Sequence, residues 1–204
     1  MTIFYDRGHR DLQDEFESRA LADRLEAFVV KDEIGEDDRQ FIEKMDFFFL
    51  STINEGGFPT KSYKGGSPGL VKVLDNKTLL FPCYDGNGMW LSAGNIDARH
   101  NVGLLFIDFE GLGRLRLEGL ATLRRDAAAL SNWYEVAIAI QVKVTRVWPN
   151  CPRYIHPMTR TENAEHVPRE GIDTPAPNWK SIDAFSDVMP PLPHTLKQKG
   201  KSED

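Results

Sequence analysis

The stretch from Leu79 to Asp108 decides the fold: Leu-Leu-Phe-Pro-Cys-Tyr-Asp-Gly-Asn-Gly-Met-Trp-Leu-Ser-Ala-Gly-Asn-Ile-Asp-Ala-Arg-His-Asn-Val-Gly-Leu-Leu-Phe-Ile-Asp. A short apolar run ends at Pro82, and a polar turn with two glycines follows at 84–88. A segment at 89–98 has Leu91 and Ile96 as apolar anchors, and a second apolar run occupies 102–107. The order strand, glycine turn, helix, strand directs backbone N–H groups and a helix start toward an anionic ligand. Glycine turns are common elsewhere, so this pattern needs support from its neighbours.

The flanking sequence predicts a mainly β (α+β) protein. Apolar alternation and turn residues predict seven strands joined by short connections, which favours an antiparallel barrel with peripheral helices. The run from Phe47 to Ile53 is nearly continuous and is expected to be buried on both faces. The strands are expected at 47–53, 58–64, 70–74, 78–81, 102–107, 114–121 and 138–147, and the helices at 11–30, 37–45 and 126–137.

Three parts are expected along the chain. Residues 1–36 form a helical extension, residues 37–156 form the barrel domain, and residues 157–204 form a proline-rich arm with a disordered end from Lys197 to Asp204. In the helix at 11–30, apolar side chains fall on one face and charged ones lie largely opposite.

Composition limits the function. The 204 residues carry a net charge of −6, which argues against general binding to nucleic acid or to anionic membranes. No run reaches the roughly 18 apolar residues of a membrane span, and the N-terminus lacks a signal-peptide pattern, so we expect a cytoplasmic protein. Cys83 and Cys151 are widely separated, and we expect both to be reduced.

Two groups of positively charged residues could be either ordinary surface residues or part of a binding site. On the strand that contains Lys61, Ser62, Tyr63 and Lys64, odd and even positions point to opposite faces, and the ordinary explanation is a solvated hairpin. Arg114 and Arg116 share one face of a later strand, either in surface salt bridges or as a clamp for a phosphate.

Other chemistries have little support. Gly111-Leu112-Gly113 is not a dinucleotide fingerprint, and no P-loop is present. The five histidines lack metal-ligand spacing, so no metal site is expected. Ser62 and Ser92 have neither a nucleophile elbow nor evident His–Asp partners.

Taken in order, these motifs resemble the FMN-binding split barrels of the pyridoxamine 5′-phosphate oxidase-like family. The resemblance covers about residues 37 to 156. It rests on Phe49–Thr52 with Gly57–Pro59, Lys64–Gly69, Phe81–Pro82 with Gly86–Asn87, Gly94–Ile96, Val102–Asp108, Arg114–Ala121 and Asn150–Tyr154.

The resemblance implies a six-stranded antiparallel split barrel that forms a homodimer with FMN at the subunit interface. It places Lys61, Ser62, Tyr63 and Lys64 near the isoalloxazine edge. It places Pro82, Cys83 and the turn Asn87-Gly88-Met89 along the ribityl chain and phosphate, and Arg114 or Arg116 reaches the cofactor from the other subunit. No catalytic residue follows from it.

One departure concerns the phosphate. Pyridoxamine phosphate oxidases proper have a Ser-Arg-Lys run where this chain has Asn87-Gly88-Met89, so two phosphate-binding charges are missing. The expected function is flavin-mediated electron or hydride transfer with a small-molecule substrate. The alternatives are a non-catalytic flavin carrier or redox sensor, and a split barrel that binds haem or a deazaflavin. For haem, His100 or His156 would have to face the pocket.

Overall fold

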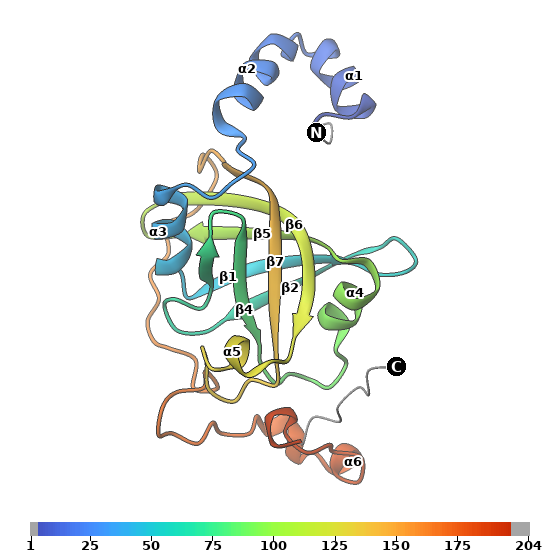
Figure 1. Ribbon diagram of the computed structural model, residues 1–204, viewed down its shortest axis with the longest axis vertical. Helices are drawn as coiled ribbons and strands as arrows, with labels where there is room; N and C mark the ends of the chain where they lie inside the picture. Colours follow the sequence, from blue (N-terminus) through green and yellow to red (C-terminus); the bar gives the residue numbers. More distant parts are fainter. Residues whose placement is uncertain (1–3, 197–204) are drawn as a thin grey trace.

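The computed structural model describes residues 4–196 and contains one seven-stranded antiparallel sheet that curves into a barrel (Figure 1). The strand order is β2-β1-β5-β6-β7-β4-β3, so β2 and β3 are the two edges of the sheet. Seven strands form where the resemblance implied six. Their bounds are β1 Phe47–Ile53, β2 Pro59–Gly65, β3 Lys72–Asp75, β4 Thr78–Cys83, β5 Asn101–Asp108, β6 Gly113–Arg124 and β7 Ile138–Pro149.

The interior of the barrel is built from alternate residues of these strands. The rings of Phe48, Phe81 and Phe106 meet at its centre, with Phe48 4.9 Å from Phe81 and 5.3 Å from Phe106 between centroids. Leu115 and Leu117 of β6 are buried, as their alternation with charged residues predicted. Apolar burial of this kind supplies most of the stabilisation of a small barrel.

Strand β1 corrects one expectation. Its burial alternates along the strand, with Phe48, Leu50 and Thr52 buried and the residues between them half-buried, so only one face is in the core. The aromatic residues on its other face, Phe47 and Phe49, are covered by one another and by Tyr63 of β2. A continuous apolar run here reflects an aromatic outer surface.

Strand β4 continues through Pro82 to Cys83, past the expected end. Pro82 pairs with Ala139 of β7 on one side, whereas β3 pairs with β4 only as far as Leu80. The missing N–H of Pro82 therefore faces no neighbouring strand, which is the position where a sheet tolerates proline.

The pairing of β6 with β7 contains a bulge between Glu118 and Gly119. A Cβ atom on Gly119 would lie 2.5 Å from the carbonyl oxygen of Lys143, so only glycine allows the two backbones to approach this closely. The bulge increases the local bend that a closed barrel requires.

Two helices pack on the barrel. Helix α3 (Glu36–Lys44) begins where the carboxylate of Asp38 accepts from the Gly35 amide at 2.9 Å, and Ile42 anchors it in the core. Helix α4 (Leu91–Arg99) lies between β4 and β5, as the central stretch predicted, and buries Ala93 and Ile96. The helix expected at 126–137 is only one turn, α5 (Ala127–Leu130), and the remainder is turns.

The N-terminal extension is a helical hairpin, α1 (Arg7–Glu15) and α2 (Arg19–Val29), where a single helix was expected at 11–30. Glu17 between them has φ of 52°, a left-handed conformation that breaks helical hydrogen bonding. Figure 1 shows the hairpin standing away from the barrel. Both core clusters lie outside it, since their first member in sequence is Ile34.

The arm after β7 runs down the barrel with little regular structure (Figure 1). Within the described residues it contains only the short turns η1 (Asn178–Ser181), α6 (Asp183–Ser186) and η2 (Pro193–Thr195). This agrees with its many prolines, which remove backbone donors and interrupt helices. The disordered end expected at 197–204 lies outside the described residues.

Candidate functional site

A cavity of about 330 Å³ lies at the opening between the edge strand β2, the end of β4 and the start of α4. Strand β2 contributes Ser62 and Lys64, which pair with Leu50 and Phe48 and therefore face the barrel interior. Because β2 is an edge strand, polar residues on this inner face reach solvent through the opening. The cavity is lined by Ser62, Lys64, Cys83, Tyr84, Gly86, Asn87, Gly88, Trp90, Leu91, Ser92 and Ala93.

The turn from β4 into α4 forms one wall of this cavity. Gly88 has φ of 76° and Trp90 has φ of 53°, so two left-handed residues turn the chain into the helix. Such a conformation is unfavourable for tryptophan, and strain of this kind concentrates at binding sites. The Asn87 side-chain oxygen accepts from the Met89 amide at 3.1 Å and holds the turn.

Helix α4 directs its N-terminus at the cavity. Its first three residues line the cavity wall, and Trp90 at the N-cap position makes no side-chain capping bond. The first N–H groups of a helix have no partner within the helix and carry a partial positive charge, so an uncapped N-terminus favours an anion. Lys64 adds a full positive charge, and among the described residues no carboxylate lines the cavity.

Lys64 and Cys83 influence each other's protonation. Burial lowers the pKa of the Lys64 ammonium, and interaction with Cys83 opposes that shift. Burial raises the pKa of the Cys83 thiol, and Lys64 opposes this shift too. Burial also raises the pKa of Tyr84 to about 12, so its hydroxyl stays protonated and can donate a hydrogen bond. Within the described residues Lys64 forms no ion pair, so its charge is available to a ligand.

Polar contacts hold α4 against β1 and β2. The hydroxyl oxygens of Ser62 and Ser92 are 3.2 Å apart. The Asn95 side-chain amide donates to the hydroxyls of Thr52 at 3.0 Å and Thr60 at 3.2 Å. These contacts fix the start of α4 relative to Lys64, so the cavity keeps its shape.

The structure brings together part of the predicted cofactor set. Ser62, Lys64, Cys83, Asn87 and Gly88 line the cavity. Pro82 is buried in β4 next to Cys83, and Met89 is exposed on the turn. Tyr84, Trp90 and Ser92 also line the cavity and were not among the predicted cofactor residues, although all three lie between Leu79 and Asp108.

The other four predicted residues lie on the outer face of the sheet. Lys61 and Tyr63 alternate with the cavity residues of β2, and Arg114 and Arg116 alternate with buried Leu115 on β6. Arg114 donates to the carbonyl oxygen of Cys151 at 2.5 Å, while its Nε atom is buried without a hydrogen-bond partner. Within one chain these residues line no part of the 330 Å³ cavity.

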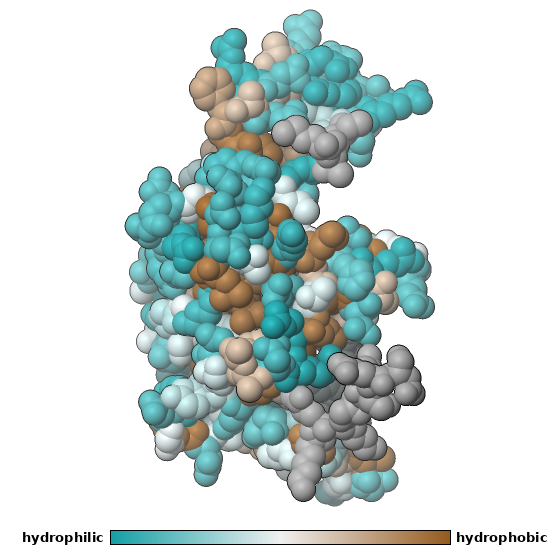
Figure 2. All heavy atoms as spheres, viewed as in Figure 1, coloured by the Kyte–Doolittle hydropathy of each residue, from teal (hydrophilic) through white to brown (hydrophobic). Residues whose placement is uncertain are grey.

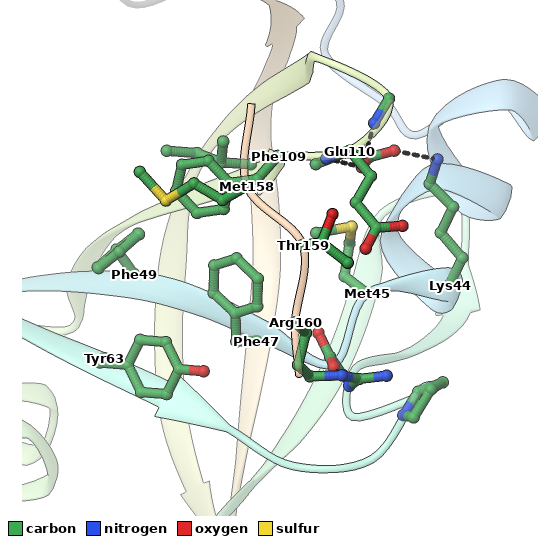
Figure 3. Close-up of a pocket in the computed structure, with 15 residues that line it drawn as sticks. Lys44, Met45, Phe47, Phe49, Tyr63, Phe109, Glu110, Met158, Thr159 and Arg160 are labelled. Carbon is green, nitrogen blue, oxygen red and sulfur yellow. Dashed lines mark hydrogen bonds and ion pairs between the residues drawn. The ribbon is translucent and has the colours of Figure 1, made fainter. Parts of the chain in front are cut away.

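A second cavity, of about 620 Å³, lies on this outer face beside α3 (Figure 3). We call it the aromatic groove. The Phe47 ring is nearly parallel to those of Tyr63 and Phe109, at centroid distances of 5.4 and 5.8 Å. Ion pairs border it, Lys44 with Asp108 at 2.7 Å and Arg160 with Asp46.

The C-terminal arm reaches the cavity turn. Lys180 forms an ion pair with Asp85, a residue 95 positions away in sequence. Two further cavities, of about 370 and 320 Å³, lie between the arm and this turn and share Gly86 and Asn87 with the 330 Å³ cavity. The arm therefore packs against the outer side of the wall that encloses the candidate site.

Residues 4–196 contain neither a metal-ligand cluster nor a membrane-spanning helix. No three His, Cys, Asp or Glu side chains there converge as metal ligands. None of the described helices combines the length and apolar character needed to cross a bilayer. Cys83 and Cys151 are both free thiols.

The fold and site define an antiparallel split barrel with a cavity at its opening that is lined by Lys64 and the start of α4. The chain belongs to the pyridoxamine 5′-phosphate oxidase family, whose model matches residues 34–149. This confirms the family resemblance noted in the sequence. No curated protein matches the chain.

Several solved structures are similar to this chain at low identity. A putative pyridoxamine 5′-phosphate oxidase from Lactobacillus delbrueckii is 19% identical, with coverage of 58% of this chain and 95% of that chain and a TM-score of 0.47. An FMN-binding protein from Syntrophomonas wolfei is 10% identical, with coverage of 68% and 96% and a TM-score of 0.44. HutZ, the heme storage protein from Vibrio cholerae, is 12% identical, with coverage of 56% and 93% and a TM-score of 0.41.

Proposed function

We propose that this protein is an FMN-dependent oxidoreductase that works as a homodimer, with FMN bound at the subunit interface. The main observation is the 330 Å³ cavity, in which Lys64 and the uncapped start of α4 provide positive charge and no carboxylate from residues 4–196 opposes it. Cofactor pockets typically measure about 300–1,000 Å³, so this cavity is at the small end of that range. A small cavity in the single chain is what we expect if a second subunit completes the site.

The residues present fit the parts of FMN. Ser62 and Lys64 are suited to the polar edge of the flavin ring, with Trp90 and Leu91 as apolar walls. Pro82, Cys83 and the turn Asn87-Gly88-Met89 would follow the ribityl chain toward the phosphate. The free amides at the start of α4 and the Ser92 hydroxyl offer the phosphate donors in place of the missing Ser-Arg-Lys run.

The outer-face residues are assigned to the partner's site. The family resemblance implies a homodimer with flavin at the subunit interface. Arg114 has a buried Nε–H with no acceptor, and a phosphate or ring oxygen of a cofactor held by the other subunit would satisfy it. Lys61, Tyr63 and Arg116 share that face and would lie at the same interface.

A bound flavin would supply the redox chemistry, by accepting a hydride or electrons at its N5 atom from a small molecule. The protein's own residues position the ring, exclude water and adjust the electrostatics. Lys64 would place its ammonium near the ring edge that becomes negative on reduction. The thiol of Cys83 stays protonated at neutral pH because burial raises its pKa, so it adds no competing negative charge.

The absorption spectrum tests this proposal. Purified protein should be yellow, or should retain bound FMN after incubation with FMN and removal of the free flavin. The absorption band of the bound flavin should bleach on anaerobic reduction. Protein that is colourless once free FMN has been removed after incubation would refute the proposal. Turnover with NADH or NADPH and a panel of amines and aldehydes separates an oxidoreductase from a carrier or redox sensor, which would bind flavin without turnover.

Haem is the second candidate, and the histidines count against it. His100 is exposed, with its Nδ1 atom 3.2 Å from the Ala121 carbonyl oxygen, and His156 is exposed on the arm. Neither lines the 330 Å³ cavity. A Soret band after addition of haem would reverse this preference. Cytoplasmic location is part of the proposal and is supported by two free thiols, which persist in a reducing compartment.

A further inference from the structure

The N-terminal hairpin has its apolar side chains on the outside. Arg10 pairs with Asp23 at 2.5 Å, Arg19 pairs with Asp14, and the Tyr5 hydroxyl donates to the Ala22 carbonyl oxygen at 3.2 Å. These polar contacts occupy the faces where the two helices meet. Phe28 is 80% exposed and Phe16 is 71% exposed, and the other large exposed apolar residues of the hairpin are Leu12, Leu21 and Leu25.

The exposed side chains of α2 form a stripe. Leu21, Leu25 and Phe28 follow the i, i+4, i+7 spacing of one helical face. Large apolar stripes rarely stay in water on a folded protein and usually mark an interaction surface. Figure 2 shows apolar residues on this hairpin and over the middle of the barrel.

The hairpin is tied to its own barrel at a point that keeps the stripe away from it. Lys31 and Val147 exchange backbone hydrogen bonds of 2.9 and 2.8 Å, only two residues after α2 ends at Val29. The Phe4 ring contacts Trp148 at 5.4 Å between centroids. Swinging α2 onto its own aromatic groove would break these contacts, so the groove of the same chain does not receive the stripe.

The aromatic groove complements the stripe in shape and charge. It is a large apolar hollow bordered by Phe47, Phe49, Tyr63 and Phe109, and no hairpin residue of the same chain lines it. Figure 3 shows Glu110 extending from its turn toward Thr159, and among the described residues its carboxylate forms no ion pair.

Arg24 is the matching charge on α2. It lies three residues after Leu21 and four before Phe28, at the edge of the stripe, and it too lacks an ion-pair partner within the described chain. An unpaired cation beside an apolar stripe therefore matches an unpaired carboxylate beside an apolar groove. Both surfaces belong to the same chain, so a two-fold dimer can use each of them twice.

We propose that the N-terminal hairpin of each subunit packs its Leu21–Leu25–Phe28 stripe into the aromatic groove of a second copy, with Arg24 beside the partner's Glu110. The inference rests on the homodimer of the proposed function. It assigns that dimer a contact surface on the same outer face that carries Tyr63.

Disulfide trapping tests this contact in the full chain. Exposed Cys151 is replaced by serine, and Phe28→Cys is combined with Glu110→Cys. Mild oxidation should give a covalent dimer on a non-reducing gel, and mixing ¹⁵N-labelled with unlabelled chains should show that the 28–110 link joins two molecules. The matched control carries Ala20→Cys in place of Phe28→Cys, because Ala20 is exposed on α2 about a quarter turn away from the stripe. It should give at least fivefold less link.

A charge swap provides a second test without cysteines. Arg24→Glu and Glu110→Arg should each raise the dimer dissociation constant about two- to fivefold in analytical ultracentrifugation. The double variant should return to within about twofold of the wild type. Effects that simply add in the double variant would overturn the proposal.

The outcomes separate this inference from the proposed function. A 28–110 link within one chain, equal links from the Ala20 control, or a monomeric wild type would overturn the hairpin contact. Yellow dimeric protein without the link would leave the flavin proposal standing. Colourless protein that forms the intermolecular link would support the hairpin contact and refute the flavin proposal.

Discussion

Replacing Lys64 with methionine tests the central electrostatic feature of the candidate site. The substitution keeps a long flexible side chain in the cavity and removes its charge. We expect two opposite consequences, a lower flavin reduction potential and a more stable apoprotein. Lys64 would then both favour the reduced flavin and destabilise the folded apoprotein.

The change in potential follows from the charge that reduction places on the flavin ring. A hydrogen bond to a charged group contributes about 1.5–3 kcal/mol more than no contact. If Lys64 makes that contact only with the reduced anionic ring, its loss lowers the two-electron potential by about 30–60 mV, because about 1.4 kcal/mol corresponds to 30 mV. Spectroelectrochemical titration of the FMN-loaded variant measures the shift.

The stability change follows from the pKa of Lys64. Burial lowers the folded-state pKa below the ordinary value of 10.5, so the unfolded chain binds more protons than the folded chain between those two values. Wild-type stability therefore rises with pH through that window, and below it the folded protein holds a desolvated ammonium. The methionine variant should lose this rise. At neutral pH its apoprotein should be more stable by about 1 kcal/mol, or about 2–4 °C in Tm.

Lys143→Met is the matched control. Lys143 is exposed on β7 and lies outside the 330 Å³ cavity, so the flavin potential should not change. A Lys64 variant whose flavin potential stays at the wild-type value would refute the assigned position of Lys64. An apoprotein that becomes less stable at neutral pH would refute the argument from desolvation.

Three further predictions concern the scaffold around the site. Asn95→Ala removes the donor to buried Thr52 and should destabilise the protein by about 1–2 kcal/mol and weaken FMN binding, as followed by urea unfolding and fluorescence titration; unchanged FMN affinity would show that α4 is positioned by other contacts. Gly119→Ala places a Cβ atom 2.5 Å from the Lys143 carbonyl oxygen and should cost about 1–3 kcal/mol of unfolding free energy, and a neutral result would mean that the bulge relaxes freely. The hydrogen bond from Lys44 is the main reason that the pKa of Asp108 is lowered. The stabilisation of the folded state by the Asp108 carboxylate is therefore present above the ordinary pKa of 3.8 and is lost as pH falls through the lowered folded-state pKa. Acid titration of stability should therefore be shallower for Asp108→Asn, and identical curves would contradict the assignment.

Local sequence patterns determined the order of elements in the barrel. Alternation around Leu115 and Leu117 predicted β6, and the stretch from Leu79 to Asp108 predicted the order of strand, turn, helix and strand. These signals are local, because alternation with a period of two and glycine turns depend on residues close in the chain. The family also followed from the ordered motifs, and its model matches residues 34–149.

Tertiary structure decided which predicted residues share a surface. Lys64 faces the barrel opening because its strand is an edge strand, whereas Lys61 and Tyr63 of the same strand lie on the outer face. The tertiary structure also places the uncapped start of α4 at the cavity beside Lys64, which makes it a candidate anion site. Strand order and the meeting of segments far apart in sequence depend on packing across the whole chain.

The helical hairpin marks the limit of a sequence-based prediction most clearly. Apolar periodicity from Leu12 to Phe28 indicated an amphipathic face, but a single left-handed residue at Glu17 divided the helix. Periodicity shows that an apolar face exists and cannot show which surface will cover it, because burial is a property of the assembled molecule. The sequence alone therefore determined the order of the strands and the family, and the fold decided which charges, rings and helix ends meet.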